Sequence, residues 1–328
     1  MSQEPLETRN ESKTDSYVLA SWWPFVGVSM VFTLVGALQL HFWIPDLASP
    51  FFVQYLVFQM IFLIFLVFKR KKLQGLAVLP FVIICLYKII PSYFPPSEQV
   101  ANSQAFPRVS FLQMNVNAKN TQYERLVESV NYYQPDVVLF EEVTEQCFEA
   151  LKEKLPDTYR VVQAQPQSDN FGIAIFSKIK AFESRLIPLG YLKLPAVSAV
   201  FEKDGKKIEV LGVHTVPPLV RDYFIERNLA CDEMVLLRKK GMDRFVLMGD
   251  LNNTIWSAYF KDLLKNSGLK DSSQGFGIQP TWHAHIMILS IPIDHCLVSS
   301  HFQVLKRETG AANGSDHYPV YVEAAIVK

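Results

Sequence analysis

The stretch PDVVLFEEV at residues 135–143 decides the fold class of this chain. A short apolar run between a proline and two carboxylates is typical of a buried strand that ends in a polar site. Strand-like and helix-like segments alternate on both sides of it, and Lys203, Asp204 and Gly205 indicate a hairpin turn. We therefore expect a mixed α/β domain over residues 108–328, with antiparallel pairs as well as crossover connections.

Polar residues also recur directly after the other expected strands. They are Asn115, Glu141 with Glu142, His214, Asp250 with Asn252, Asp294, and Asp316 with His317. Each signal is weak alone, but the set of carboxylates, amides and two histidines suits Mg²⁺, which prefers oxygen ligands. Metal-assisted attack of water on a phosphate ester fits this set best. The sequence holds no GxGxxG, GxxxxGK[ST], HExxH or GxSxG motif, which disfavours dinucleotide binding, a phosphate loop, a zinc protease and a serine esterase.

The motifs resemble those of the endonuclease/exonuclease/phosphatase superfamily, and the whole chain is similar to its bacterial membrane-anchored members. The matching stretches are FLQMNV (111–116), PDVVLFEEV (135–143), GIAIFS (172–177), GDLN (249–252), IDH (293–295) and GSDHYPV (314–320), spread over about residues 108–324. The resemblance implies a four-layer α/β sandwich, in which two packed β-sheets are flanked by helices and the site lies at one sheet edge. It also implies a hydrolase of phosphate esters that depends on Mg²⁺ or Mn²⁺.

The same resemblance implies a role for each matching residue. The implied metal ligands are Glu142, Asn115 and Asp316, and the implied catalytic residues are His214, Asp250, Asn252, Asp294 and His317. Glu142 is expected to be the principal ligand, and Asp294 is expected to orient His317. His214 would donate to a phosphate oxygen. The general base stays open between Asp250 and His317.

Some positions depart from the family pattern or lie outside it. Glu141 stands where the family often has glutamine, so it either draws the metal closer or admits a second one, or its side chain points away as alternate strand residues do. His214 lacks its usual neighbours in the motif. Arg221 and Arg227 either reach a substrate phosphate or belong to a solvated helix face, and Trp282 is a further candidate for substrate contact.

The first 95 residues carry most of the apolar excess. No Lys, Arg, Asp or Glu lies within residues 17–44 or 51–68, and residues 73–94 hold Lys88 alone. A helix over each stretch would cross a hydrocarbon core of about 30 Å, although buried helices of a soluble all-α domain are the alternative. We therefore expect about three transmembrane helices before the sandwich. The expected parts are a leader at 1–16, a transmembrane region at 17–94, a linker at 95–107 and the catalytic domain at 108–328.

The short loops predict an orientation for these helices. Residues 69–72 are all basic, whereas the loop at 44–50 holds Asp46 and no Lys or Arg. Because basic loops stay in the cytoplasm, the leader is expected inside. Three crossings then place the catalytic domain on the periplasmic or extracellular side of a bacterial inner (cell) membrane. If residues 73–94 did not cross, that domain would return to the cytoplasm.

The charge balance bears on the substrate. Lys+Arg and Asp+Glu are both 32, so no general basic field attracts nucleic acid. Nucleic acid, phospholipid and small phosphodiesters all remain candidate substrates. A catalytically inactive, membrane-tethered binding module is the alternative from another class, which the retention of every key polar position disfavours. The sequence indicates no protein partner, and Cys147, Cys231 and Cys296 are expected to be buried and reduced.

Overall fold

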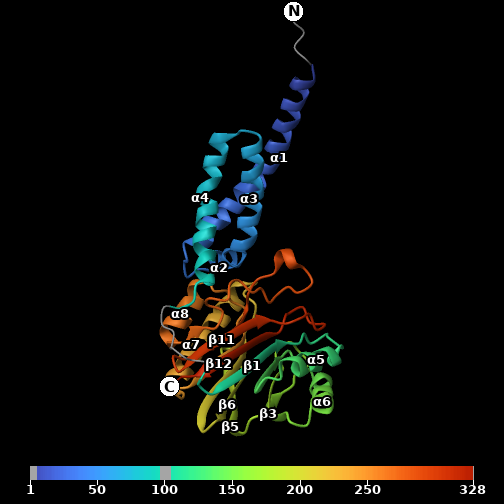
Figure 1. The fold of residues 1–328 in the computed structure, drawn as a ribbon, viewed down its shortest axis with the longest axis vertical. Coiled ribbons are helices and arrows are strands. Elements are labelled where there is room, and N and C mark those ends of the chain that lie inside the picture. The colour runs from blue at the N-terminus through green and yellow to red at the C-terminus, as the bar shows by residue number, and fades with distance from the viewer. Residues whose placement is uncertain (1–5, 97–104, 328) are drawn as a thin grey trace, which may run out of the picture.

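The computed structural model describes residues 6–96 and 105–327, and a bundle of long apolar helices stands on an α/β domain in it (Figure 1). Residues 1–5 of the expected leader, residues 97–104 of the expected linker and Lys328 lie outside the described residues. The remaining part of the expected leader is helical, because α1 already begins at Leu6.

Within residues 6–96 the bundle holds four helices. They are α1 (Leu6–Ala37), α2 (Trp43–Ala48), α3 (Phe52–Phe68) and α4 (Lys72–Ile89), with short 3₁₀ turns at Ser49–Phe51 and Ile90–Tyr93. Among the described residues, three segments are long and apolar enough to cross a membrane, judged by length and composition: Ala20–Ala37, Trp43–Phe68 and Lys72–Tyr93. The first helix ends at Ala37, where the chain turns with a positive φ at Gln39, so the first span stops short of residue 44.

In the part of the α/β domain that the structure describes, residues 105–327, the strands form two six-stranded sheets. The first has the order β11-β12-β1-β2-β4-β3 and the second β5-β6-β7-β8-β10-β9. The strands are β1 (Arg108–Asn115), β2 (Val137–Glu141), β3 (Arg160–Gln165), β4 (Ile173–Ser177), β5 (Ala181–Leu189), β6 (Leu194–Lys203), β7 (Lys206–His214), β8 (Phe245–Asp250), β9 (Lys270–Asp271), β10 (Asp294–Val298), β11 (Phe302–Thr309) and β12 (Val320–Ile326). The helices are α5 (Tyr123–Tyr133), α6 (Glu145–Lys154), α7 (Arg221–Lys240) and α8 (Ala258–Ser267), and a 3₁₀ turn spans Met287–Leu289.

The two sheets pack face to face and each carries helices on its outer face. Alternation along β2 sends Val137 and Leu139 into the core between the sheets, whereas Val138 and Phe140 pack under α5 and α6. The helices α7 and α8 cover the second sheet in the same way. The fold is therefore the expected four-layer sandwich.

Strand pairing brings the polar strand ends to one edge. The parallel pair β1–β2 aligns Asn115 with Glu141, and the parallel pair β7–β8 aligns His214 with Asp250. The antiparallel neighbour β10 starts at the same place, because Asp294 lies opposite Asp250. Parallel strands end at the same edge, so residues far apart in the sequence meet there.

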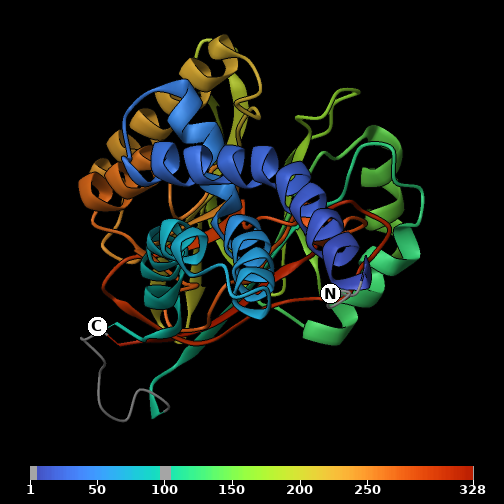
Figure 2. The same cartoon turned by 90° about the horizontal axis from the view of Figure 1, so that it is seen from above.

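The helix bundle rests on this same edge, and Figure 2 shows its helices standing over the domain. Trp256 packs against Phe52 and Ile89 in a shared apolar cluster, and its indole N–H donates to the carbonyl of Lys88 at 3.0 Å. The backbone N–H groups of Gly275 and Gly277 donate to the carbonyl of Ser92, each at 3.0 Å. All four cysteines are buried and free, as expected for the three in the domain.

Candidate active site

A cavity of about 390 Å³ lies where the sheet edge meets the bundle. The α/β domain contributes most of its polar lining, namely Glu142, His214, Asp250, Asn252, Trp282, Asp316 and His317. The segment between α1 and α3 contributes the opposite wall, with Asp46, Leu47, Pro50 and Phe51. Two further predicted residues, Asn115 and Asp294, lie directly behind the lining and bond to it. The structure thus brings the predicted catalytic and metal residues together in one place.

His317 is held from behind by a carboxylate. Its Nδ1 lies 2.9 Å from Asp294 Oδ2, and both side chains are buried. Burial lowers the pKa of His317, but the charges of Asp294 and Asp250 and the Asp294 hydrogen bond outweigh burial and raise it to about 10. The Nε2 atom is left facing Asp250, at 3.8 Å from Oδ2. Asp294 therefore orients the ring as the motif implies.

Asp250 lies between the two histidines. Its Oδ2 is 3.6 Å from His214 Nε2, and its Oδ1 accepts the backbone N–H of Asn252 at 2.8 Å. Burial and the neighbouring Asp294 hold the pKa of Asp250 well above its usual value. Burial, followed by the charge of His317, lowers the pKa of His214 to about 4, so His214 is neutral at physiological pH. A neutral imidazole can donate one hydrogen bond to a phosphate oxygen.

Glu142 follows β2 in a left-handed conformation, with φ of 58°, which turns its carboxylate into the pocket. Asn115 Nδ2 donates to its Oε1 at 3.0 Å, and the backbone N–H of Ala118 donates to its Oε2 at 3.1 Å. Burial raises the pKa of Glu142 despite these two bonds. The carboxylate is therefore fixed in position, and each oxygen keeps a lone pair for a cation.

Asp316 is fixed by two donors. Asn117 Nδ2 donates to its Oδ1 at 2.6 Å and Trp282 Nε1 donates to its Oδ2 at 3.0 Å. The metal role of Asp316 stays a prediction. A cation bound by Asp316 would have to share carboxylate oxygens that already accept hydrogen bonds from Asn117 and Trp282. Trp282 lines the pocket, and its indole N–H is used by this carboxylate, so only the ring remains for a substrate.

Glu141 points away from the pocket and into the space between the sheets. It is fully buried, its Oε1 accepts the backbone N–H of Asp250, and its Oε2 accepts Gln113 Nε2 at 2.6 Å. The same Gln113 nitrogen lies 2.7 Å from Asp294 Oδ1. Burial, with the charges of Asp294 and Asp250, raises the pKa of Glu141 well above its usual value. Of the alternatives for this residue, the side chain pointing away is the one observed.

Gly249 allows this approach of the two sheets. A Cβ at this position would lie 1.8 Å from the carbonyl oxygen of Val213 and 2.7 Å from Glu141 Oε1, and φ is +146°. Only glycine fits such a contact. The Gly-Asp pair is thus more than a turn, because the glycine lets Glu141 reach the backbone of Asp250.

Of the two predicted arginines of α7, Arg227 lines the pocket and Arg221 does not. Arg221 is exposed and is absent from the pocket lining. Arg227 is buried and reaches the pocket wall, but its Nη1 is bonded to Asp46 Oδ2 at 2.8 Å and to the carbonyl of Asn252 at 3.1 Å. Arg227 is therefore not part of a solvated helix face, and its contact with a substrate phosphate stays a prediction. It ties the bundle to the loop that follows Asp250.

A divalent cation fits the residues present. The buried carboxylates of Glu142 and Asp250 crowd together with raised pKa values, and a cation would relieve that excess of negative charge. Asp250, Asp294 and His317 can also reach one point with an atom each. Asp294, however, already bonds His317 and Gln113, so we favour the carboxylate of Glu142, which faces the pocket. Oxygen donors of this kind suit Mg²⁺ or Mn²⁺.

The wall at residues 46–51 is the part of the site that sequence reasoning missed. Asp46 was recognisable as the acid in an otherwise uncharged loop, but its partner Arg227 lies far along the chain. Phe171 and Leu219 also line the pocket without any motif to mark them. Apolar residues of this kind carry no signal in a single sequence, because the fold alone decides which ones surround a cavity.

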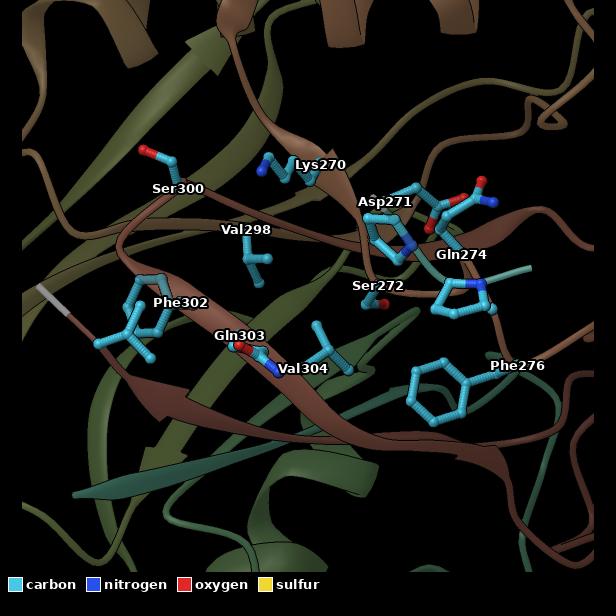
Figure 3. Close-up of a pocket in the computed structure, with 14 residues that line it drawn as sticks. Lys270, Asp271, Ser272, Gln274, Phe276, Val298, Ser300, Phe302, Gln303 and Val304 are labelled. Carbon is cyan, nitrogen blue, oxygen red and sulfur yellow. The ribbon is translucent and has the colours of Figure 1, made fainter. Parts of the chain in front are cut away.

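A second cavity, of about 440 Å³, lies beside β9 and β11 (Figure 3). Lys270 and Asp271 are the charged residues among the described residues that line it, and the remaining lining includes Val298, Phe302 and Val304. It holds neither a histidine nor a pair of carboxylates among those residues. The candidate catalytic residues therefore belong to the first cavity.

Comparison with solved structures shows the same fold in several proteins of low sequence identity. TDP2 of D. rerio, humanized by 14 mutations, matches with a TM-score of 0.56 and 17% identity over 66% of this chain and 98% of its own. A family protein from Bacteroides thetaiotaomicron matches with a TM-score of 0.56 and 18% identity over 67% and 98% of the two chains. The human Nocturnin catalytic domain, solved with bound sulfate, matches with a TM-score of 0.55 and 18% identity over 67% and 95%.

A search of curated proteins gives no match. The model of the "Endonuclease/Exonuclease/phosphatase family" matches residues 112–317, which is well over half of the chain. Members of that family are metal-dependent hydrolases of phosphate esters, so the match confirms the enzyme class that the motifs indicate. The chain belongs to the endonuclease/exonuclease/phosphatase family.

Proposed function

We propose that this protein is a membrane-anchored, Mg²⁺-dependent phosphodiesterase. The observation that carries the proposal is the meeting of Glu142, Asp250 and His317 in one pocket, with Asp294 behind the histidine. An inactive binding module would have no need for a buried imidazole clamped by a carboxylate. This arrangement supports catalysis over binding alone.

Each residue of the pocket has a proposed role in the reaction. Glu142, with Asn115 beside it, would hold the cation, which supplies charge that stabilises the phosphate in the transition state. Asp250 and His317 face each other at 3.8 Å and handle the proton of the attacking water. His214 donates to a phosphate oxygen, and Asn252, whose backbone is fixed by Asp250, helps to position the phosphate.

The bundle supports a defined orientation in a bacterial inner membrane. The basic residues 69–72 form the turn between α3 and α4 and the first residue of α4, at the end of the bundle away from the α/β domain (Figure 1). Because basic loops remain in the cytoplasm, the catalytic domain would face the periplasm or the exterior. Alkaline phosphatase fused after Lys328 should then be active, and green fluorescent protein fused there should stay dark. The reverse pattern would return the domain to the cytoplasm.

The activity itself is tested with the purified full chain and bis-p-nitrophenyl phosphate. Chelation should abolish release of nitrophenol, and added Mg²⁺ or Mn²⁺ should restore it. Full turnover in excess chelator would overturn the metal role. p-Nitrophenyl phosphate in parallel distinguishes a diesterase from a monoesterase, because the proposal expects the diester to be the better substrate.

A further inference from the structure

One wall of the catalytic pocket comes from the bundle, and this fixes where the pocket opens. Asp46, Leu47, Pro50 and Phe51 line it, and α3 begins with the next residue. The candidate spans that end at Ala37 and Tyr93 finish at the same end of the bundle. Since span ends mark the boundary between hydrocarbon and water, the pocket opens at the level of the lipid head groups.

The pocket has a polar floor and an apolar mouth. We call the buried carboxylates and histidines of the site the floor, and the apolar surface that Phe51, Pro218, Leu219 and Ile291 contribute the mouth. The lining also includes the polar residues Asp46, Arg227, Asn170, Asn253 and Thr254. Pockets for small ligands pair a few polar groups with apolar walls in this manner. The two-part lining suits a molecule with a phosphate at one end and apolar chains at the other.

An exposed apolar loop stands beside the mouth. Trp282 and Ile291 form a β-bridge with each other, and both line the pocket. The loop between them carries four consecutive apolar residues at its tip, Ile286, Met287, Ile288 and Leu289. Met287 is 83% exposed and Ile288 is 76% exposed. Figure 1 shows this orange segment on the face of the domain that meets the bundle.

A direct bond ties this loop to the bundle. Gln54 Nε2, in the first turn of α3, donates to the carbonyl of Ser290 at 2.9 Å. The tip is therefore held beside the first turn of α3, which lies within the candidate span Trp43–Phe68. Consecutive exposed apolar residues at that level are suited to insertion among lipids, whereas in water they would be a liability.

The charges around the pocket disfavour a nucleic-acid strand. Arg227 is the one Lys or Arg among the described residues lining the pocket, and Asp46 already pairs with it. A strand of DNA or RNA needs several basic contacts along its phosphates. A substrate with a single phosphodiester needs none beyond the metal and the histidines.

We propose that the substrate is a membrane phospholipid, whose phosphodiester reaches the floor while its acyl chains stay in the bilayer beside residues 286–289. This inference rests on the proposed function and adds the substrate class. Water forms a new P–O bond, one P–O ester bond breaks, and the alcohol that leaves takes up a proton. The products are a phosphate monoester and an alcohol.

The test uses the full chain reconstituted with Mg²⁺ in vesicles of phosphatidylethanolamine and phosphatidylglycerol. Lipid alcohol and head-group products are measured by mass spectrometry, and bis-p-nitrophenyl phosphate and a single-stranded DNA oligonucleotide are assayed on the same preparation. The variant Met287→Ser/Ile288→Ser removes the apolar tip. The control variant Val161→Ser/Phe182→Ser removes two residues, each 42% exposed, at the opposite end of the sheets.

The proposal expects lipid turnover by the parent protein and a loss of about tenfold or more in the tip variant, with cleavage of the soluble diester unchanged. The control variant should retain both activities. Cleavage of the soluble diester without lipid turnover, faster cleavage of DNA than of lipid, or a tip variant as active on vesicles as the parent would each overturn the lipid inference and leave the proposed function standing. Failure to cleave any diester would overturn the proposed function itself.

Discussion

Removing the carboxylate of Asp294 is expected to disable His317 without touching the residues that would hold the metal. The Asp294 Oδ2 to His317 Nδ1 distance is 2.9 Å, and Asp294 does not line the pocket. His317 therefore depends on Asp294 for its orientation and proton state. The substitutions Asp294→Ala and His317→Ala should remove one catalytic unit between them.

The magnitude follows from that dependence. A positioned acid–base group contributes about 10²–10⁴-fold, so we expect a loss of about 10³-fold in kcat for His317→Ala. Asp294→Ala removes the hydrogen bond to His317 but keeps the imidazole, so we expect it to lower kcat by about 10²-fold. The double variant should resemble His317→Ala, at about 10³-fold rather than the 10⁵-fold of independent losses, a coupling of about 2.7 kcal/mol.

The assay is the rate of bis-p-nitrophenyl phosphate cleavage at saturating Mg²⁺ for the parent and the three variants. Asp294→Asn keeps the shape of the buried side chain, so it separates loss of charge from loss of packing. Arg221→Ala, at an exposed position outside the pocket, serves as the independent partner and should simply multiply with His317→Ala. If the Asp294 and His317 losses multiply as well, the two residues do not act as a unit and our interpretation of the clamp is wrong.

Two further predictions concern stability. Gly249→Ala should prevent folding, because its Cβ would lie 1.8 Å from a backbone oxygen, whereas Gly205→Ala, with nothing within 4 Å, should cost about 1–2 kcal/mol for its positive φ alone. The yield and melting temperature of the purified proteins measure both, and a well-folded Gly249→Ala protein would contradict the packing argument. Asp46→Leu should destabilise the protein by about 3–5 kcal/mol because it leaves Arg227 buried and unpaired, and Asp46→Leu/Arg227→Met should recover much of that loss. Thermal inactivation in detergent compares the two, and a single variant as stable as the parent would show that the pair contributes nothing.

The interior strands of the fold were predictable from the sequence, and the edge strands were not. The strands β1, β2, β4, β6, β7, β8, β10 and β12 all correspond to apolar runs. The strands β3, β5, β9 and β11 are shorter or more strongly interrupted by polar and charged residues, and each is the edge of a sheet. Edge strands are half-exposed and carry charges, which blunts aggregation and removes the apolar pattern that identifies a strand.

The residues of the candidate site also divide into those that the sequence marks and those that it does not. The sequence predicted that Glu142, Asp250 and His317 lie together, because strand ends and motif spacing mark them, and the structure places all three in one pocket. The side chain of Glu141 and the pairing of Arg227 depend on which face meets which element, and a single sequence does not contain that information. The same holds for the wall that the bundle contributes, since the contact joins Asp46 to a residue 181 positions away.

The central claim is that a metal held by Glu142 activates a phosphodiester in this pocket, and one paired measurement tests it most directly. Mn²⁺ binding by calorimetry and turnover of bis-p-nitrophenyl phosphate are measured on the same preparations of the parent protein and Glu142→Gln. We expect the parent to bind Mn²⁺ and turn over, and Glu142→Gln to keep its fold while losing metal affinity and roughly 10³-fold or more in rate. A Glu142→Gln protein that binds Mn²⁺ and cleaves the diester like the parent would contradict the account.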